Sequence, residues 1–168
     1  MSCYAKPRLR KGCAVGIIEL MDYANDNLCL RALVAAGLPP TPCKDPRQMS
    51  PLVLAYIGDA VYDLFVRTLL VECSDATAHG MHMQAAGRVC AAAQAEAFRR
   101  IEPHLGEEEL AVYKRGRNAH MGTVPKNARI ADYRTATGLE ALMGYLYLSG
   151  QDARMNQLMR LALDAPEI

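Results

Sequence analysis

Tryptophan is absent from this sequence, phenylalanine occurs twice, and no apolar run is long. A membrane-spanning helix needs about 20 consecutive apolar residues. The best N-terminal candidate, residues 14–20, is interrupted by Glu19. We therefore expect no membrane association.

Closely spaced cysteine pairs are also missing. The six cysteines are scattered, without a C-x-x-C pair or a zinc-finger spacing, at Cys3, Cys13, Cys29, Cys43, Cys73 and Cys90. This pattern favours reduced thiols and predicts a cytoplasmic protein. His79 and His82 could face the same way on a helix, but no cysteine pair accompanies them. We expect surface or partly buried histidines there rather than a metal site.

What the chain does contain is enough apolar material for one domain. Of its 168 residues, 51% are apolar, which suffices for one core and falls short of two well-developed ones. The core must be built from Leu, Ala, Val, Met and Tyr, a composition that favours helix packing over a β-sandwich. No segment alternates apolar and polar residues as a strand would. The fold class we expect is all-α.

Prolines divide the chain into two parts. A helix is possible from Gly16 to Ala36, and three prolines within residues 37–43 end it, because proline removes a donor and clashes with the preceding turn. We expect residues 1–48 to be an N-terminal extension, partly helical or mobile. The main domain then covers residues 49–168 and opens with Ser50 as N-cap and Pro51 at the first helical position.

Within that domain the pattern predicts a series of helices. We expect them over residues 51–72, 77–102, 106–118, 128–148 and 151–165. The first is apolar almost all round, which indicates the centre of a bundle or a dimer interface.

Two acids stand alone in apolar, glycine-containing helices. Asp59 lies in the run LAYIGDAV and Glu140 in the run TGLEALMGYL, and neither has a basic residue within helical reach. A carboxylate stripped of water must be neutralised, find a hydrogen bond or bind a cation. Our central hypothesis is that the two helices cross and that Asp59 and Glu140 share a divalent metal ion. The alternative is that hydroxyls of Tyr56, Tyr62 or Thr137 satisfy them.

The net charge of +1 hides a basic segment. The segment from residue 114 to residue 134 contains one acid, Asp132, and six bases, namely Lys114, Arg115, Arg117, Lys126, Arg129 and Arg134. Such a cluster favours a phosphate-binding surface, where neutralised phosphates release counterions. A solvated loop without a ligand remains the alternative.

Taken together, these segments resemble a known family. The runs LAYIGDA (54–60), KRGRNA (114–119), PKN (125–127), Tyr133-Arg134 and LEALMGYL (139–146) are similar to the motifs of Mini-ribonuclease III. The resemblance extends from about Met49 to Leu163. It implies the helical ribonuclease III endonuclease-domain fold, a homodimer, and a Mg²⁺-dependent endoribonuclease that cuts double-stranded RNA. It also implies a role in maturing the ends of 23S ribosomal RNA, with a large-subunit ribosomal protein as a possible partner.

The resemblance also implies roles for particular residues. Asp59 corresponds to the signature aspartate and Glu140 to the second catalytic and metal-binding acid. Full-length ribonuclease III enzymes carry further acids where this chain has Ala55 and Thr137. The expected RNA-binding residues are Lys114, Arg115, Arg117, Asn118, Lys126, Asn127 and Arg134. The competing hypothesis is a non-catalytic RNA-binding or ribosome-assembly protein on the same helical fold.

Overall fold

The computed structural model describes residues 28–37, 45–120 and 129–164 of the chain. The chain divides into two compact units, residues 1–44 and 45–168. In the first unit the structure describes helix α2 (Leu28–Ala35), which lies within the helix expected from Gly16 to Ala36. The rest of that expected helix, and the expected mobility of the first residues, lie outside the described residues. The second unit begins at Asp45, four residues before the predicted start of the main domain.

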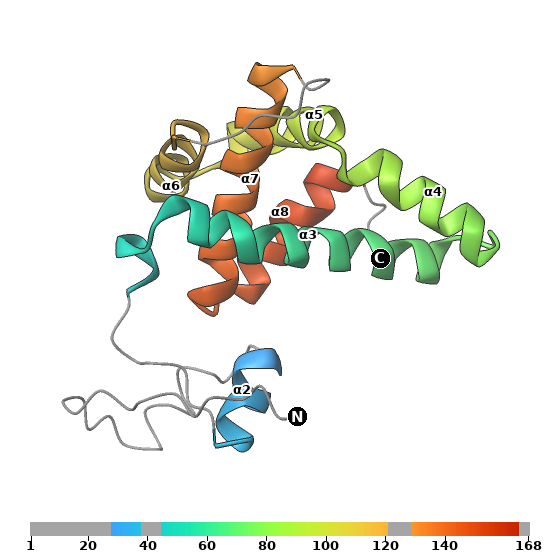
Figure 1. The fold of residues 1–168 in the computed structure, drawn as a ribbon, viewed down its shortest axis with the longest axis horizontal. Helices are drawn as coiled ribbons and strands as arrows, with labels where there is room; N and C mark the ends of the chain where they lie inside the picture. Colours follow the sequence, from blue (N-terminus) through green and yellow to red (C-terminus); the bar gives the residue numbers. More distant parts are fainter. Residues whose placement is uncertain (1–27, 38–44, 121–128, 165–168) are drawn as a thin grey trace, which may run out of the picture. The chain divides into compact units, whose positions relative to one another are not determined.

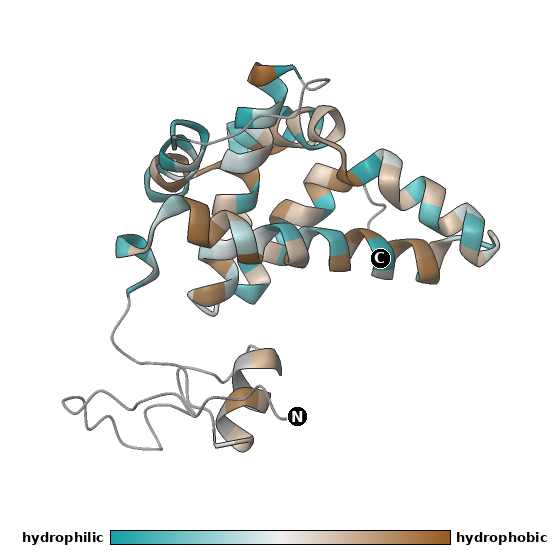
Figure 2. Cartoon of the chain, in the orientation of Figure 1, coloured by the Kyte–Doolittle hydropathy of each residue, from teal (hydrophilic) through white to brown (hydrophobic). Residues whose placement is uncertain are grey.

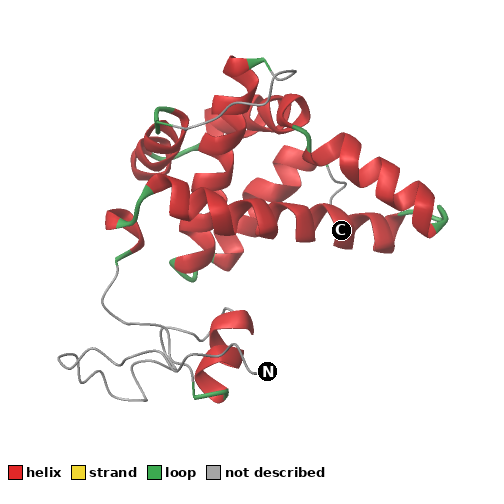
Figure 3. Ribbon diagram, in the orientation of Figure 1, coloured by secondary structure: helices red, strands yellow, loops and turns green. Residues whose placement is uncertain are grey.

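In the described ranges of the second unit, helices are joined by short loops and no strand occurs (Figure 3). Its elements, in chain order, are η1 (Pro46–Gln48), α3 (Pro51–Cys73), α4 (Ala78–Val89), α5 (Ala91–Ile101), η2 (Glu102–His104), α6 (Glu107–Arg117), α7 (Ile130–Leu148) and α8 (Asp152–Leu163). The all-α prediction is confirmed. None of the helices in the described ranges has the length and apolar character needed to cross a membrane.

The single helix predicted over residues 77–102 is wrong. Cys90 is extended, with φ −68° and ψ 152°, and it separates α4 from α5. Its carbonyl accepts a hydrogen bond of 3.0 Å from the Gln94 N–H and so begins α5. No proline or glycine marks this break. The change of direction places Phe98 and Ile101 in the core, and this tertiary burial outweighs the local preference for one continuous helix.

The core is organised around α7. This helix is buried over most of its length, and Leu139, Leu142 and Leu146 have no exposed surface. Helices α3, α5, α6 and α8 pack against it. In Figure 1 the orange α7 crosses the teal α3, with α6 beside it and α8 behind.

Two glycines allow α3 and α7 to touch backbone to backbone. A Cβ atom on Gly58 would lie 1.8 Å from the carbonyl oxygen of Glu140, and one on Gly144 would lie 2.0 Å from the carbonyl oxygen of Leu54. No side chain fits between the helices at this point. The crossing therefore sets the turn of α3 that carries Asp59 directly against the turn of α7 that carries Glu140.

A second close contact joins α6 to α7. A Cβ on Gly116 would lie 2.6 Å from the Cβ of Ala141, and one on Gly138 would lie 2.5 Å from the ring of Tyr113. Tyr113 in turn stacks on Phe98 of α5, with ring centroids 3.7 Å apart. The C-terminal end of α6 is thereby held beside the middle of α7.

Candidate active site

Asp59 and Glu140 meet in one cleft. Asp59 directly follows Gly58, the residue that touches the Glu140 carbonyl, so the α3–α7 crossing brings the two acids together. The cleft has a volume of about 600 Å³ and is lined by Leu52, Ala55, Tyr56, Ile57, Asp59, Ala60, Tyr133, Thr137 and Glu140. The predicted crossing of these two helices is confirmed, and both carboxylates line one cleft; that they share a metal ion stays a prediction.

The two carboxylates influence each other electrostatically. Burial raises the pKa of Glu140 to about 7, and the charge of Asp59 adds to this increase. The side chain of Gln94 acts in the opposite direction and favours the charged form of Glu140. No base is among the described residues that line the cleft. In the part of the chain that the structure describes, the site therefore places two acids together without a cationic side chain to balance their charge, which is the arrangement that a bound cation would relieve.

One expectation about Asp59 needs correction. Its apolar sequence neighbours predict a desolvated carboxylate, yet in the single chain Asp59 is exposed at the rim of the cleft, and Glu140 is the half-buried acid. The reason is geometric: Leu54, Val61 and Tyr62 face the core, whereas Tyr56 and Ala60, which line the cleft with Asp59, are themselves exposed. Among the hydroxyls considered as partners, that of Thr137 donates to the carbonyl of Tyr133 at 3.1 Å. Tyr62 is buried and lines a different cavity.

The sequence alone did not single out Gln94. This residue of α5 is only 1% exposed. Its spacing with Ala97, Phe98 and Ile101 puts it on the buried face of α5. That spacing is the signal that could have found it, because a glutamine on an apolar face at positions i, i+3, i+4 and i+7 is out of place unless it has a partner.

The predicted basic residues gather at the end of α6 and the start of α7. Lys114, Arg115 and Arg117 form the last turn of α6, Asn118 is its C-cap, and Arg134 lies in the first turns of α7. All five are exposed. Their position beside the cleft follows from the packing of α6 on α7. Lys126 and Asn127 lie outside the described residues.

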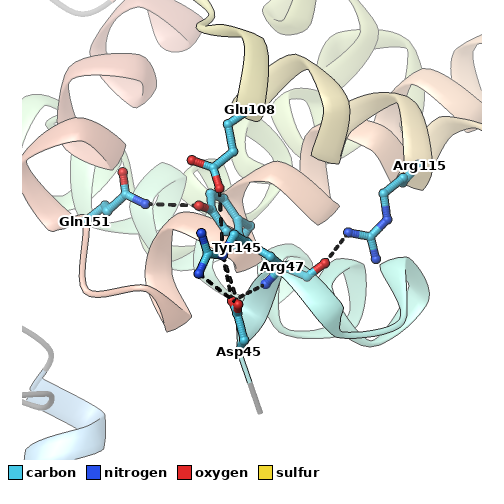
Figure 4. A network of polar contacts seen from close by, with 6 residues as sticks. All are labelled: Asp45, Arg47, Glu108, Arg115, Tyr145 and Gln151. Carbon is cyan, nitrogen blue, oxygen red and sulfur yellow. Dashed lines mark hydrogen bonds and ion pairs between the residues drawn. The ribbon is translucent and has the colours of Figure 1, made fainter.

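Arg115 differs from its basic neighbours. Its guanidinium donates to the backbone carbonyl of Arg47 and, at 2.6 Å, to that of Met49. Figure 4 shows this guanidinium reaching toward Arg47, whose own side chain pairs with Asp45 at 2.9 Å. Arg115 thus ties the end of α6 to the segment that leads into α3.

Across the described ranges, no cluster of three or more His, Cys, Asp or Glu side chains could hold a metal ion. His79 and His82 are both exposed on α4, as expected for surface histidines. The described lining of the cleft holds two carboxylates, and Ala55 and Thr137 stand where a third or fourth acid could lie.

Comparison with known proteins decides the family. A model of the ribonuclease III domain matches residues 52–151, which include both acids of the cleft. The chain belongs to the ribonuclease III family. It is 46% identical over 125 residues to the Mini-ribonuclease 3 of Clostridium tetani, covering 74% of this chain and 83% of that protein. It is also 47% identical over 119 residues to the Mini-ribonuclease 3 of Brevibacillus brevis, covering 71% of this chain and 89% of the relative.

A comparison with solved structures supports the same family. A crystal structure of a protein from Fusobacterium nucleatum matches this ribonuclease III chain with a TM-score of 0.65 and 27% sequence identity, covering 72% of this chain and 97% of that one. The resemblance to Mini-ribonuclease III and the ribonuclease III fold, both expected from the sequence, are confirmed. As a member of this family the protein is an endoribonuclease, a hydrolase of phosphodiester bonds.

Proposed function

We propose that this endoribonuclease cleaves double-stranded RNA with Mg²⁺ as cofactor and matures the ends of 23S ribosomal RNA precursors in the cytoplasm. The observation that carries the proposal is the meeting of Asp59 and Glu140 in one cleft that no base lines among the described residues. The family supports the class of substrate, and the basic end of α6 beside the cleft supports a polyanionic one.

The donor set of the cleft fits Mg²⁺. This ion takes oxygen ligands, keeps several waters, and is commonly held by one or two carboxylates together with substrate phosphate. Asp59 and Glu140 would hold it, and the volume of about 600 Å³ leaves room for waters and a phosphate. When bound, the ion supplies activation of water and neutralises charge on the scissile phosphate.

Side chains around the cleft would bind the RNA substrate. Lys114, Arg117 and Arg134 are exposed and, in our proposal, contact the phosphates of the duplex. Arg115, Asn118, Lys126 and Asn127 complete the proposed RNA-binding set. Because the deep groove of A-form RNA is closed to side chains, these residues would read the backbone and the shape of the helix.

A homodimer is part of the proposal, and an exposed stripe on α3 supports it. Val53, Tyr56, Leu64 and Val71 are 54%, 83%, 64% and 64% exposed. Their spacing of three, eight and seven residues puts them on one side of the helix. Figure 2 shows apolar positions, in brown, along α3 as far as its C-terminal end. A second copy packed on this stripe would cover it and place two clefts in one twofold assembly, one for each RNA strand.

Recognition of a particular precursor needs more than phosphate contacts. We propose that structure in the ribosomal RNA, or a large-subunit ribosomal protein bound to it, selects the cleavage site.

The test is cleavage of a long duplex RNA in Mg²⁺ by the wild type and by Asp59→Asn. A metal ligand supplies several kcal/mol of transition-state stabilisation, so we expect the variant to be slower by about 100-fold or more. Asp75→Asn is the matched control, because Asp75 is an exposed acid just beyond the end of α3. Equal cutting by Asp59→Asn would contradict the metal site. Binding without cutting by the wild type would support a non-catalytic RNA-binding or ribosome-assembly role.

A further inference from the structure

Gln94 is a buried polar side chain without a hydrogen-bond partner for its amide nitrogen. The residue is 1% exposed and is among the most buried large side chains of the chain. Within the described residues its Nε2 atom has no hydrogen-bond partner. Leaving a buried amide donor unpaired costs about 1–3 kcal/mol of stability. A leucine at this position would carry no such penalty, because it has no polar group to bury. The residue therefore calls for an explanation beyond packing.

The group that faces this amide is the carboxylate of Glu140. Helix α5 packs against α7, and the Gln94 side chain acts on Glu140 in the direction that favours its charged form. It does so without a hydrogen bond of ordinary geometry. Glu140 thus has a buried amide on its protein side, and on its open side the cleft that it shares with Asp59.

From this arrangement we infer that Gln94 is the positioning residue of the metal site, whose amide N–H donates to the inner oxygen of Glu140 and turns the outer oxygen toward the cleft. The inference rests on the proposed function. Carboxylates that bind metals are themselves held by hydrogen bonds, and removing such a partner typically lowers metal affinity by about 10–100-fold. The chain does not need this amide in order to fold. The Glu140 carboxylate needs it in order to present one oxygen to a metal ion in a fixed direction.

The test is Mn²⁺ binding to the full chain without RNA, measured by electron paramagnetic resonance, together with a thermal melt. In Gln94→Leu we expect about a 10-fold loss of Mn²⁺ affinity. The melting temperature of the metal-free protein should be unchanged or higher, because the amide nitrogen has no hydrogen-bond partner in the metal-free structure and is replaced by an apolar group of similar volume. Gln84→Leu is the matched control, since Gln84 is exposed on α4, and it should leave Mn²⁺ affinity at the wild-type value. In cleavage assays the Mg²⁺ concentration for half-maximal rate should rise by the same factor only in Gln94→Leu.

The Mn²⁺ affinity of Gln94→Leu decides whether Gln94 positions Glu140. Wild-type affinity in Gln94→Leu, with or without a change in melting temperature, overturns the inference and leaves Gln94 as a packing residue. Gln94→Met, which keeps the length of the side chain, answers the same question if the leucine variant does not fold. If the wild type itself neither binds Mn²⁺ nor cuts duplex RNA, the proposed function fails and the inference fails with it. If the wild type does both and the variants match it, the inference alone is wrong.

Discussion

At the scale of single residues, the chemistry of the cleft depends on how Glu140 is held. Burial and the nearby charge of Asp59 both favour its protonated form, and the pKa of about 7 lies well above the usual value of 4.5. A metal ion needs the charged form, so protons and metal compete for this carboxylate.

This competition predicts a pH dependence of stability in metal-free protein. The folded chain keeps the Glu140 proton up to a pH of about 7, whereas the unfolded chain releases it near 4.5. The folded state binds more protons in this interval, so the free energy of unfolding should fall as the pH rises through it. Urea unfolding across this range should show the decline in the wild type and a smaller one in Glu140→Gln. Added Mg²⁺ should reduce the decline above neutrality, and identical pH profiles for the two proteins would contradict the assignment.

Arg115 and Arg117 are neighbours in sequence with different surroundings. Arg115 donates to the carbonyls of Arg47 and Met49, so Arg115→Ala should lower the free energy of unfolding by about 1–3 kcal/mol. Arg117→Ala should leave stability unchanged and reduce the salt slope of RNA binding by about one, the loss of one phosphate contact. Denaturant melts and binding titrations at several salt concentrations separate the two effects. A salt slope unchanged in Arg117→Ala would mean that the RNA runs elsewhere.

At the scale of helices, the crossing of α3 and α7 is the feature that creates the site. Gly58 and Gly144 leave the two backbones in contact where the helices cross, and the carboxylates of Asp59 and Glu140, one on each helix, line the cleft at this crossing. The distance between Asp59 and Glu140 is therefore governed by how closely the two backbones approach.

Gly58→Ala tests this dependence. Its Cβ would overlap the backbone oxygen of Glu140 at 1.8 Å, which forces the helices apart and should cost at least about 1–3 kcal/mol. Cleavage should fall more steeply than stability alone explains, because the two acids separate. Gly87→Ala is the control, since a Cβ there meets nothing within 4 Å and should stabilise α4 by about 0.5–1 kcal/mol. Wild-type cleavage by a folded Gly58→Ala protein would show that the close approach is not required.

A second link between helices was visible only in the structure. Glu109, expected from sequence as an acid at the positive end of α6, is 9% exposed. It forms a bidentate pair with Arg154 of α8, with distances of 2.7 and 2.8 Å. Hydrogen bonding to Arg154 lowers the pKa of Glu109, so the pair fastens α8 to the start of α6 under conditions where the carboxylate is charged.

At the scale of the whole molecule, the exposed apolar stripe on α3 predicts self-association. Leu64 is 64% exposed near the middle of that helix, and Leu64→Asp should convert the proposed dimer to a monomer because a charge would be buried in the interface. Met83→Asp is the matched control on α4, where Met83 is 59% exposed. Sedimentation velocity gives the oligomeric state of each protein. A wild-type monomer, or an undisturbed dimer in Leu64→Asp, would exclude this stripe as the interface.

Much of this molecule follows from the sequence because the relevant signals are local. The absence of strand patterns, the N-cap and proline at Ser50 and Pro51, and the three acids that begin α6 each act within a few residues. The two solitary acids were also recognisable, since charge in an apolar segment is costly wherever that segment packs.

Other features required the tertiary structure, because they depend on contacts between residues far apart in the chain. The break at Cys90 has no local breaker and exists because α5 must turn to pack on α7. The exposure of Asp59 and the burial of Gln94 depend on which side of each helix its neighbours cover. The carbonyl partners of Arg115 are more than sixty positions away in the chain. Local chemistry determined most of the helices and made the two acids recognisable in the sequence. Long-range packing decided that they meet in one cleft, with Asp59 exposed and Glu140 half-buried.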